Sequence, residues 1–457
     1  MPTVNREIFR EYDIRGVVED DLDVPAVRAI GRAIGTALRV QDGAAFVVGR
    51  DVRPSSPAIR VSLIDGLRAT GAQVSDAGVV PTPVLYFAAI HLESDGAVMV
   101  TASHNPPEFN GFKICRGVES LAGEEIRALA DIIERRDFSR GNGRAVRVEV
   151  LDDYRAVLGS KFSFDQPLKV VVDGGNGVMG ELAVRVIESF GHEVIPLYCE
   201  PDGDFPNHHP DPSVAENLED LIETVRTEGA DLGVAFDGDG DRLGAVDEKG
   251  AILWPDYLMI LFARDVLSRR PGAPIVFEVK CSMNLIRAIE KAGGRPVMWK
   301  AGHSLIKKKL KEENAPLAGE FSGHMFFADD YYGYDDALYA ALRLLDLRAR
   351  AGAPLSSLLA DVPPLFASPE IKLPCPDAEK FHVVEGLRDR LEGRLPLITL
   401  DGVRADFGDG WGLVRASNTT GALTARFEAE SPERLEEIRS EILGHLKAFS
   451  QVEGVNG

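Results

Sequence analysis

Apolar residues in this chain come in short runs that alternate with longer amphipathic stretches. Residues 45–51 (AFVVGRD) predict a buried strand, a helical stretch extends from there to Gly71, and residues 73–76 predict a second strand. The same order of strand, helix, glycine and strand recurs over residues 168–198 and 274–300. Repeats of this kind are typical of α/β domains with parallel strands. The hydrophobic pattern therefore predicts three α/β domains.

The last part of the chain has a different pattern. After the proline-rich residues 363–376, we expect a helix near 378–391, strands between 397 and 427, and a final helix that begins at Ser431-Pro432, where serine suits the N-cap and proline the first turn. Three similar mixed-sheet α/β domains are thus followed by a smaller α+β domain. We place the four domains at residues 1–150, 151–255, 256–368 and 369–457.

Composition narrows the range of partners. The formal net charge of -21 argues against nucleic acid or an anionic membrane as a partner, because both need a basic surface. A phosphorylated small molecule is not excluded, since local Arg and Lys act at close range. The four cysteines are far apart, which favours reduced thiols, and the charged N-terminus lacks an apolar signal segment. We expect a cytoplasmic protein.

Residues 237–242 (DGDGDR) carry the densest chemistry in the chain. Glycine permits the tight backbone that lets three carboxylates converge, and converging carboxylates attract Mg²⁺ or Ca²⁺. The apolar flanks predict that this metal site is a loop between two strands. The acidic residues up to Glu248 also fit the spacing of an EF-hand, but Arg242 occupies its sixth position, where that loop needs glycine. A solvated acidic turn is the other alternative.

Further polar clusters follow apolar runs. Ser103 and His104 lie in the run 101–107 (TASHNPP), at a strand end where α/β sheets bind ligands. Residues 319–324 (GEFSGH) combine a carboxylate and a hydroxyl that suit sugar hydroxyls. Arg415 precedes the polar residues 417–420, which together suit a phosphate. Each cluster taken alone also fits an ordinary polar turn.

Two other patterns have a plain interpretation and a more specific one. Residues 175–180 (GNGVMG) fit the G-x-G-x-x-G pattern of nucleotide-dependent oxidoreductases, although no acidic strand end follows at the right distance, and a tight strand-to-helix turn is the preferred interpretation. Residues 307–309, three consecutive lysines, are expected on a solvated helix face.

Taken together and in order, these motifs resemble the α-D-phosphohexomutase superfamily, especially its phosphomannomutase/phosphoglucomutase group. The resemblance covers nearly the whole chain. Its motifs are residues 9–16 (FREYDIRG), TASHNPP, 110–113 (NGFK), DGDGDR, 279–282 (VKCS), 301–304 (AGHS), GEFSGH and 415–420 (RASNTT). Members often have proline where this chain has Ala416 and Gly421, so we expect altered entropy in the last loop but no lost function.

The resemblance implies four domains around a central cleft and a role for each motif. Ser103 would carry the transferable phosphoryl group, and one of its oxygens would bind Mg²⁺ together with Asp237, Asp239 and Asp241. The remaining catalytic candidates are His104, Lys113, Arg15 and His324. The substrate-binding candidates are Tyr12, Arg242, Lys280, His303, Glu320, Ser322, Arg415, Ser417, Asn418 and Thr419.

The implied reaction interconverts a hexose 1-phosphate and a hexose 6-phosphate, of mannose, glucose or both, through a 1,6-bisphosphate intermediate. One Mg²⁺ per chain and a hexose 1,6-bisphosphate activator, such as glucose 1,6-bisphosphate, are implied as well. We expect a monomer that binds phosphosugars, and neither nucleic acid nor membrane. The sequence leaves two alternatives open: a phosphoglucosamine mutase, which shares the same motifs, and an oxidoreductase that uses residues 175–180.

Overall fold

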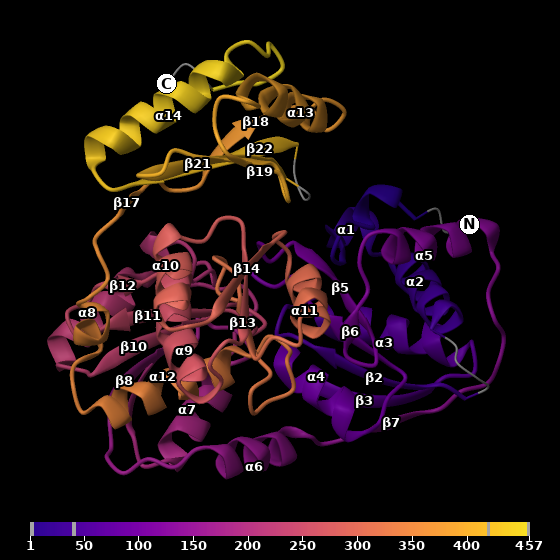
Figure 1. The fold of residues 1–457 in the computed structure, drawn as a ribbon. Coiled ribbons are helices and arrows are strands. Elements are labelled where there is room, and N and C mark those ends of the chain that lie inside the picture. The colour runs from indigo at the N-terminus through magenta and orange to yellow at the C-terminus, as the bar shows by residue number, and fades with distance from the viewer. Residues whose placement is uncertain (1–3, 39–42, 418–420, 455–457) are drawn as a thin grey trace.

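Four β-sheets, each made by a consecutive stretch of chain, organise the computed structural model (Figure 1). The structure describes residues 4–38, 43–417 and 421–454. The first three sheets mix parallel and antiparallel strands, and the fourth is antiparallel throughout. The predicted fold class, three mixed-sheet α/β domains and a smaller α+β domain, is confirmed.

Domain I is built on a sheet in the order β1-β5-β4-β2-β3-β7, with β6 beside β5. Strands β2, β3 and β4 run parallel, β2 and β3 are the strands of the predicted first repeat, and β5 returns antiparallel to β4. The elements are η1 (Arg6–Ile8), β1 (Ile14–Val17), α1 (Val18–Asp21), α2 (Val24–Ala37), β2 (Ala45–Arg50), α3 (Ser56–Arg68), β3 (Gln73–Val79), α4 (Thr82–His91), β4 (Gly96–Val100), β5 (Phe109–Arg116), β6 (Glu119–Ser120), α5 (Glu124–Arg135) and β7 (Ala145–Arg147).

Domain II has the strand order β12-β11-β10-β8-β9, and helix α6 leads into it along the lower edge of the view in Figure 1. Strands β10 and β11 pair antiparallel around the DGDGDR loop, as the apolar flanks predict. The elements are α6 (Leu151–Lys161), β8 (Lys169–Asp173), α7 (Gly180–Ser189), β9 (Glu193–Leu197), η2 (Ala215–Leu218), α8 (Glu219–Glu228), β10 (Leu232–Phe236), β11 (Leu243–Asp247) and β12 (Ile252–Leu253).

Domain III repeats the plan with the strand order β14-β13-β15-β16. Its strands β14, β13 and β15 are parallel, so their carboxyl ends lie at one edge of the sheet. The elements are α9 (Pro255–Arg269), β13 (Pro274–Glu278), α10 (Met283–Lys291), β14 (Arg295–Trp299), α11 (His303–Glu312), β15 (Leu317–Gly319), β16 (Met325–Phe327), α12 (Ala337–Ala351) and η3 (Leu355–Leu359).

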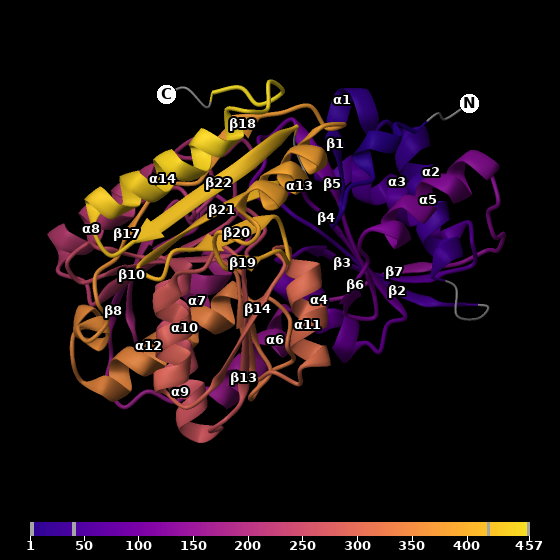
Figure 2. The same ribbon diagram turned by 45° about the horizontal axis from the view of Figure 1, so that its top comes forward.

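The C-terminal domain forms a separate lobe above the other three, with α13 and α14 on the outer face of its sheet (Figures 1 and 2). Because side chains alternate across a strand, Ala425 and Phe427 pack under the helices while Arg426 and Glu428 lie on the opposite face. The elements are β17 (Phe366–Ala367), β18 (Ile371–Pro374), α13 (Lys380–Leu391), β19 (Leu397–Ile398), β20 (Val403–Asp406), β21 (Gly410–Ala416), β22 (Ala422–Ala429) and α14 (Pro432–Leu446).

Buried apolar side chains join the first three domains in one hydrophobic core. One cluster of buried side chains runs from α4 of domain I through α7 of domain II to α9 and α12 of domain III. The C-terminal domain has its own cluster, which includes Leu387, Phe427 and Ile442. A continuous apolar core resists separation because opening it exposes apolar area to water. Domains I to III therefore form one body, and the C-terminal domain is a second one.

The two bodies are joined by an arginine clamp, formed by Arg404 and Arg426 on the sheet face that lies toward domain III. Arg404 Nη1 donates to the carbonyl oxygens of residues 279 and 281, and Arg426 Nη1 donates to that of residue 280. The Arg404 guanidinium also lies 3.7 Å from the ring centroid of Trp411. Both arginines are buried. This clamp fixes the C-terminal domain at the end of β13.

A buried carboxylate ties α6 to domain III. Asp336, the N-cap of α12, accepts the Tyr339 amide at 3.0 Å and the hydroxyls of Tyr154 on α6 and Tyr331 at 2.9 and 2.7 Å. Burial raises the pKa of Asp336 from 3.8 to about 6. Its folded-state pKa therefore lies above the unfolded value, and stability from this group is complete below the unfolded pKa and is lost as the pH rises through the folded one.

We expect a pH-dependent difference between the wild type and Asp336→Asn. A pKa raised by roughly two units corresponds to about 3 kcal/mol, so the free energy of unfolding of the wild type, relative to the variant, should fall by about that amount between roughly pH 4 and pH 7. Urea denaturation of both proteins at the two pH values measures it. A difference that does not change with pH would contradict the prediction.

None of the helices in the described residues is both long and apolar enough to span a bilayer.

Candidate active site

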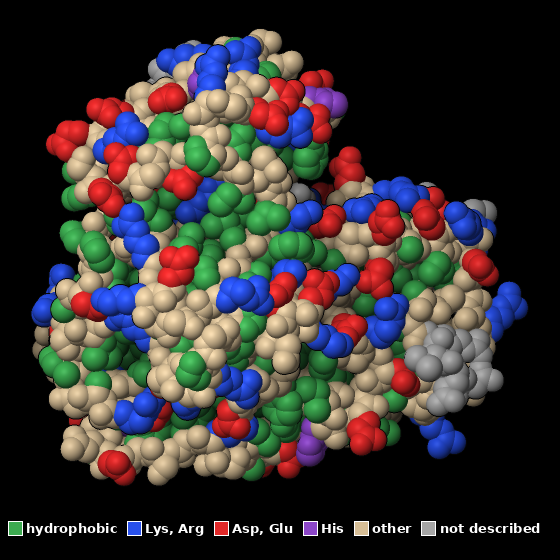
Figure 3. All heavy atoms as spheres, viewed as in Figure 1, with side chains coloured by type: hydrophobic (Ala, Val, Ile, Leu, Met, Phe, Trp, Pro, Cys, Tyr) green, Lys and Arg blue, Asp and Glu red, His purple; other side chains and the backbone are tan. Residues whose placement is uncertain are grey.

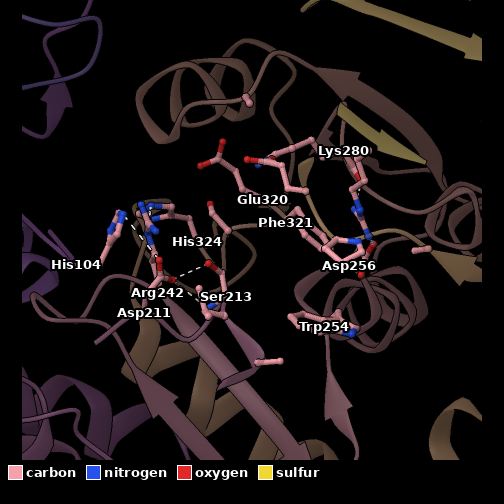
Figure 4. A pocket seen from close by; sticks show the side chains of 18 of the residues that line it. His104, Asp211, Ser213, Arg242, Trp254, Asp256, Lys280, Glu320, Phe321 and His324 are labelled. Atoms are coloured by element: carbon pink, nitrogen blue, oxygen red, sulfur yellow. Dashed lines mark hydrogen bonds and ion pairs between the residues drawn. The ribbon is translucent and has the colours of Figure 1, made fainter. Parts of the chain in front are cut away.

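A cavity of about 1340 Å³ opens between the four domains, with Arg15, Arg242, Lys280 and Lys372 as lining residues from domains I to IV. Figure 3 shows the recess between the C-terminal lobe and domain I, and Figure 4 shows His104, Arg242 and His324 grouped at one side of the cavity, away from Lys280 and Trp254. The predicted site residues that line it are Tyr12, Arg15, Ser103, His104, Lys113, Arg242, Lys280, His303, Glu320, Ser322 and His324.

Ser103 lies at the bottom of this cleft, in the loop after β4. Its φ of +52° is in the left-handed region, which is costly for a residue with a side chain and persists only when neighbours enforce it. The hydroxyl donates to Asp237 Oδ2 at 2.7 Å, across the boundary between domains I and II, and lies 3.1 Å from His104 Nδ1. The serine and the aspartate loop, 134 residues apart in the sequence, thus share one site.

The DGDGDR loop forms a buried acidic triad of Asp237, Asp239 and Asp241. Asp237 Oδ1 accepts the backbone N–H groups of residues 240, 241 and 242 at 3.0 to 3.1 Å, which turns Oδ2 toward Ser103. The flanking elements are strands, so the EF-hand alternative is wrong. The triad is fully buried, so the solvated acidic turn is wrong as well.

The triad fits a divalent cation. One oxygen from each carboxylate lies within 4.8 Å of the others, and Oδ1 of Asp239 and Oδ1 of Asp241 are buried with no hydrogen-bond partner among the described residues. Burial and the two neighbouring carboxylates raise the pKa of Asp237. Hard oxygen ligands at this spacing suit Mg²⁺ or Ca²⁺.

Lys113 on β5 supplies positive charge to the triad. Its ammonium donates to Asp239 Oδ2 at 2.6 Å and also to Asp241 Oδ2. Burial favours the neutral amine, but the three aspartates outweigh it and raise the pKa of Lys113 well above its ordinary value. Burial likewise favours a protonated Asp239, but Lys113 holds the pKa of that carboxyl below its usual range. Lys113 is therefore an ammonium in this arrangement.

Two stacked histidines of domain III form the side of the cleft next to the triad. The rings of His303 and His324 lie 5.3 Å apart, and Arg242 Nε donates to His324 Nε2 at 3.1 Å. Nδ1 of His324 lies 2.9 Å and Nδ1 of His303 3.4 Å from the same oxygen of buried Asp335. Since Nε2 of His324 accepts a hydrogen bond, its Nδ1 carries the proton that faces Asp335.

Lys307 corrects the expectation of a solvated lysine face. Its ammonium lies 3.2 Å from Asp335 Oδ1 and 4.0 Å from the ring centroid of Tyr86 in domain I. Burial favours a protonated Asp335, yet Lys307 first and then the histidines hold the pKa of this carboxyl well below its usual range. Lys307 therefore belongs to the charge network behind the two histidines.

Tyr12, Arg15 and His104 line the cleft from domain I and the serine loop. The Tyr12 hydroxyl donates to the carbonyl oxygen of Ala301 at 2.8 Å. Arg15 donates to Asn105 Oδ1 at 2.7 Å and to Asp13 Oδ2 at 2.6 Å. Burial, then Arg242 and Arg15, lower the pKa of His104 well below its ordinary value. These contacts place fixed cations and a neutral imidazole around the Ser103 hydroxyl.

The loop GEFSGH brings its carboxylate to the cleft. Glu320 Oε1 accepts the backbone N–H of Gly302, and burial raises the pKa of Glu320. Ser322 lies in the same loop and lines the cavity. Lys280 lies 3.3 Å from Glu370 Oε2 of the C-terminal domain. The sugar-binding candidates thus face the space between domain III and the C-terminal lobe.

Two described residues of the predicted phosphate loop lie beside the cavity without lining it. Arg415 and Ser417 are buried and are not among the residues that line the cavity. Arg415 instead pairs with Asp401, and the carbonyl of Ser417 accepts Lys380 Nζ at 2.5 Å. The expectations for Asn418 and Thr419 lie outside the described residues.

Comparisons with known proteins follow the same division of the chain. Four family models match it: phosphoglucomutase/phosphomannomutase α/β/α domain I over residues 6–140, domain II over 152–250, domain III over 254–366, and the C-terminal domain over 370–445. The chain belongs to the phosphoglucomutase/phosphomannomutase family. Its resemblance to the α-D-phosphohexomutase superfamily is confirmed.

Individual relatives of the family agree in length and fold. The chain is 51% identical over 448 residues to a phosphomannomutase/phosphoglucomutase of Pseudomonas aeruginosa, covering 98% of this chain and 97% of that one. It is 42% identical to a phosphoglucomutase of Neisseria gonorrhoeae, with 96% of both chains covered. A crystal structure of a phosphoglucomutase/phosphomannomutase family protein from Burkholderia thailandensis superposes with a TM-score of 0.92 at 45% identity, covering 98% of both chains. These relatives do not favour the amino-sugar mutase alternative.

The glycine motif 175–180 packs against the DGDGDR loop. The amide of Val178 donates to the carbonyl oxygen of Gly238 at 3.2 Å, and Asn176 has a φ of +55° in the turn from β8 to α7. A Cβ on Gly177 would lie 2.9 Å from that carbonyl oxygen. The motif is the tight strand-to-helix turn preferred above, and this close contact accounts for Gly177 without a nucleotide.

Gly177→Ala is expected to weaken cation binding about 10- to 100-fold while the protein stays folded, because the added methyl must displace the backbone of the metal loop. Titration calorimetry with Mg²⁺ measures the affinity. Gly159→Ala on α6 is the matched control, since a Cβ there meets nothing within 4 Å. Equal Mg²⁺ affinities of both variants would contradict the prediction.

Residues that no motif indicated complete the site. Thr82, at the start of α4, donates its hydroxyl to Asp239 Oδ2 at 2.6 Å. Asp211 lies 3.9 Å from His104 Nε2. Arg53 donates every N–H of its guanidinium. The run GRDVR at the end of β2 contains Arg53 and Asp51 as a charged pair, which is a detectable signal. Nothing in the sequence singles out Thr82 or Asp211.

Proposed function

We propose that this chain interconverts hexose 1-phosphates and hexose 6-phosphates of mannose, glucose or both, through a phosphoryl group carried on Ser103. The observation that supports it best is the 2.7 Å contact between the Ser103 hydroxyl and Asp237, at the bottom of a cleft lined by all four domains. Phosphoryl transfer depends on positioning and charge compensation, and both are built into this site.

The proposed reaction begins with phosphorylated Ser103 and a bound hexose 1-phosphate. The free sugar hydroxyl attacks phosphorus, the new P–O bond forms as the bond to Ser103 Oγ breaks, and the hydroxyl proton leaves to a base of the chain. Ser103 Oγ regains a proton and can again donate to Asp237. The resulting 1,6-bisphosphate turns end over end, and its other phosphoryl group returns to Ser103 by the reverse step.

Charge in this reaction is handled by residues around Ser103. When bound by the three aspartates and a Ser103 oxygen, one Mg²⁺ supplies positive charge that offsets the phosphoryl oxygens. Lys113 remains an ammonium beside the triad. We assign the hydroxyl proton to His324, whose Nδ1 faces Asp335 at 2.9 Å and whose Nε2, which accepts Arg242 Nε in this structure, takes the proton once the phosphoryl oxygens draw Arg242 away.

The choice of sugar depends on which of its hydroxyl groups the protein binds. Glu320 and Ser322 are proposed to bind the O3 and O4 hydroxyls, so no contact distinguishes the configuration at C2. Both glucose and mannose phosphates are then substrates. We further propose activation by glucose 1,6-bisphosphate, which phosphorylates Ser103, and a working monomer, since one chain supplies the lining from all four domains.

Two measurements test the function. The intact mass of the protein should increase by one phosphoryl group after exposure to glucose 1,6-bisphosphate. Steady-state assays with glucose, mannose and glucosamine 1-phosphates should give comparable kcat/KM for the first two and a lower value for the third. A strong preference for the amino sugar would overturn the assignment in favour of the phosphoglucosamine mutase.

A further inference from the structure

The turn Asp401-Gly402 of the C-terminal domain lies directly against Arg415 on β21. Gly402 has a φ of +86°, and a Cβ there would come within 2.3 Å of the carbonyl oxygen of Val414, so a side chain at this position would force the turn away from the strand. The close approach brings the Asp401 carboxylate beside the guanidinium. Its Oδ2 accepts Arg415 Nε at 3.1 Å and Nη2 at 2.9 Å.

The same carboxylate oxygen reaches across to domain III. Asp401 Oδ2 accepts the backbone N–H of Ala301 at 3.0 Å, just after β14. Ala301 lines the cleft, and its carbonyl oxygen accepts the Tyr12 hydroxyl of domain I. We call the contacts of Asp401 Oδ2 with Arg415 and Ala301 the Asp401 latch. Ala301 of domain III is therefore hydrogen-bonded to the C-terminal domain through the latch and to domain I through Tyr12.

The latch and the arginine clamp hold the C-terminal domain at two neighbouring strand ends. The clamp is hydrogen-bonded to residues 279–281 after β13, and the latch is hydrogen-bonded to Ala301 after β14. The clamp arginines are 3% and 5% exposed, whereas the side chains of Asp401 and Arg415 are 14% and 11% exposed. Two separated points of attachment prevent rotation about either one. Opening the latch alone removes the attachment after β14 and leaves those near β13, which include the clamp and the hydrogen bond from the Met283 amide to Glu428.

The latch occupies only one edge of the Arg415 guanidinium. Asp401 occupies the edge of the guanidinium formed by Nε and Nη2, and the remaining N–H groups belong to Nη1 and to the second proton of Nη2. Burial favours loss of the Arg415 charge, but Asp401 together with Glu278 outweighs burial and raises the pKa of the guanidinium. A carboxylate on one edge and a phosphate on the other is an arrangement that a planar guanidinium accepts.

We propose that Asp401 is a positioning residue that holds Arg415 behind the cleft wall and keeps the C-terminal domain closed while the bisphosphate intermediate turns. This inference rests on the proposed mutase function. Without Asp401, the phosphosugar itself has to order the Arg415 side chain and hold the domain. The intermediate then escapes more often before its second phosphoryl group returns to Ser103.

Asp401→Asn tests the proposal because it removes the charge and keeps the shape. In single turnovers of phosphorylated protein with labelled glucose 1-phosphate and Mg²⁺, the ratio of released bisphosphate to glucose 6-phosphate should rise about tenfold over the wild type. The steady-state KM for glucose 1-phosphate should rise about tenfold as well. A factor of this size corresponds to the free-energy cost of ordering one long side chain. Asp389→Asn on α13 is the matched control, because that aspartate is exposed and, among the described residues, pairs with its neighbour Arg388 alone.

A double variant separates positioning from a general structural effect. If Asp401 acts through Arg415, adding Asp401→Asn to Arg415→Lys should raise the bisphosphate ratio little beyond the effect of Arg415→Lys alone. Full additivity of the two changes would overturn the proposal, as would an unchanged ratio in Asp401→Asn. Asp401→Glu, which keeps the charge, should give a smaller increase than Asp401→Asn if the protein needs the anion. A wild type that releases neither product would refute the mutase function itself.

Discussion

Ser103→Ala is expected to lower mutase turnover by about four orders of magnitude or more, the scale of loss when a nucleophile is removed. Alanine has no oxygen to carry the phosphoryl group. The nearby Thr101 hydroxyl accepts the Ser103 amide at 2.9 Å, within the turn, and does not replace it in contact with Asp237. A coupled assay with glucose and mannose 1-phosphates measures the loss, and intact mass after exposure to glucose 1,6-bisphosphate shows whether the phosphoryl group is still accepted.

The fold should tolerate this change. The substitution removes the hydrogen bonds of the hydroxyl with Asp237 and with His104 Nδ1, which contribute on the order of 1 kcal/mol each. Ser160→Ala on the exposed side of α6 is the matched control and should keep both activity and phosphorylation. A mass gain of one phosphoryl group that persists in Ser103→Ala would show that another residue carries it, and the proposed mechanism would fail.

The second large effect is expected at Arg53, which is fully buried under the serine loop. Its Nε donates to Asp51, Nη1 to the carbonyl oxygens of residues 106 and 109, and Nη2 to those of residues 103 and 105. All five N–H groups of the guanidinium are thus used. Four of them hold the backbone around Ser103, whose left-handed conformation needs such enforcement.

Arg53→Ala should lower kcat about 100-fold, because a shift of the serine by about 1 Å is enough for that loss. It should also lower the free energy of unfolding by about 3–5 kcal/mol, since Asp51 stays buried without its partner. Arg53→Lys keeps only three N–H donors, so its kcat and its free energy of unfolding should lie between those of Arg53→Ala and the wild type. Steady-state kinetics and urea denaturation measure the two effects.

Two comparisons separate the serine loop from a general loss of structure. The affinity of the dephosphorylated protein for glucose 1-phosphate is expected to depend on Lys280 and Glu320 of domain III, so it should change little in Arg53→Ala. Arg116→Ala, at an exposed position on β5, serves as the control for removing an arginine from domain I. If kcat stays at the wild-type value while stability falls, Arg53 has no role in placing Ser103.

The sequence by itself was sufficient for the local structure and the chemical inventory. Alternation of short apolar runs with amphipathic stretches is a property of each segment, so the repeats 45–79 and 274–299 and the hairpin around DGDGDR follow from residues close in the chain. The order of the motifs was enough for the family. The acidic triad is also local, because its glycines and the Asp237 turn lie within six residues.

Only the tertiary structure decided what those local elements meet. The contacts of Thr82 with Asp239, Lys307 with Asp335, and Asp401 with Ala301 join residues that lie 157, 28 and 100 positions apart. Threonine, lysine and aspartate are common on surfaces, so no pattern marks the few that become buried partners. Periodicity fixes which face of an element is apolar, whereas the neighbour of each polar group depends on how whole domains pack. That packing placed Ser103 beside Asp237 and set Arg415 behind the cleft wall.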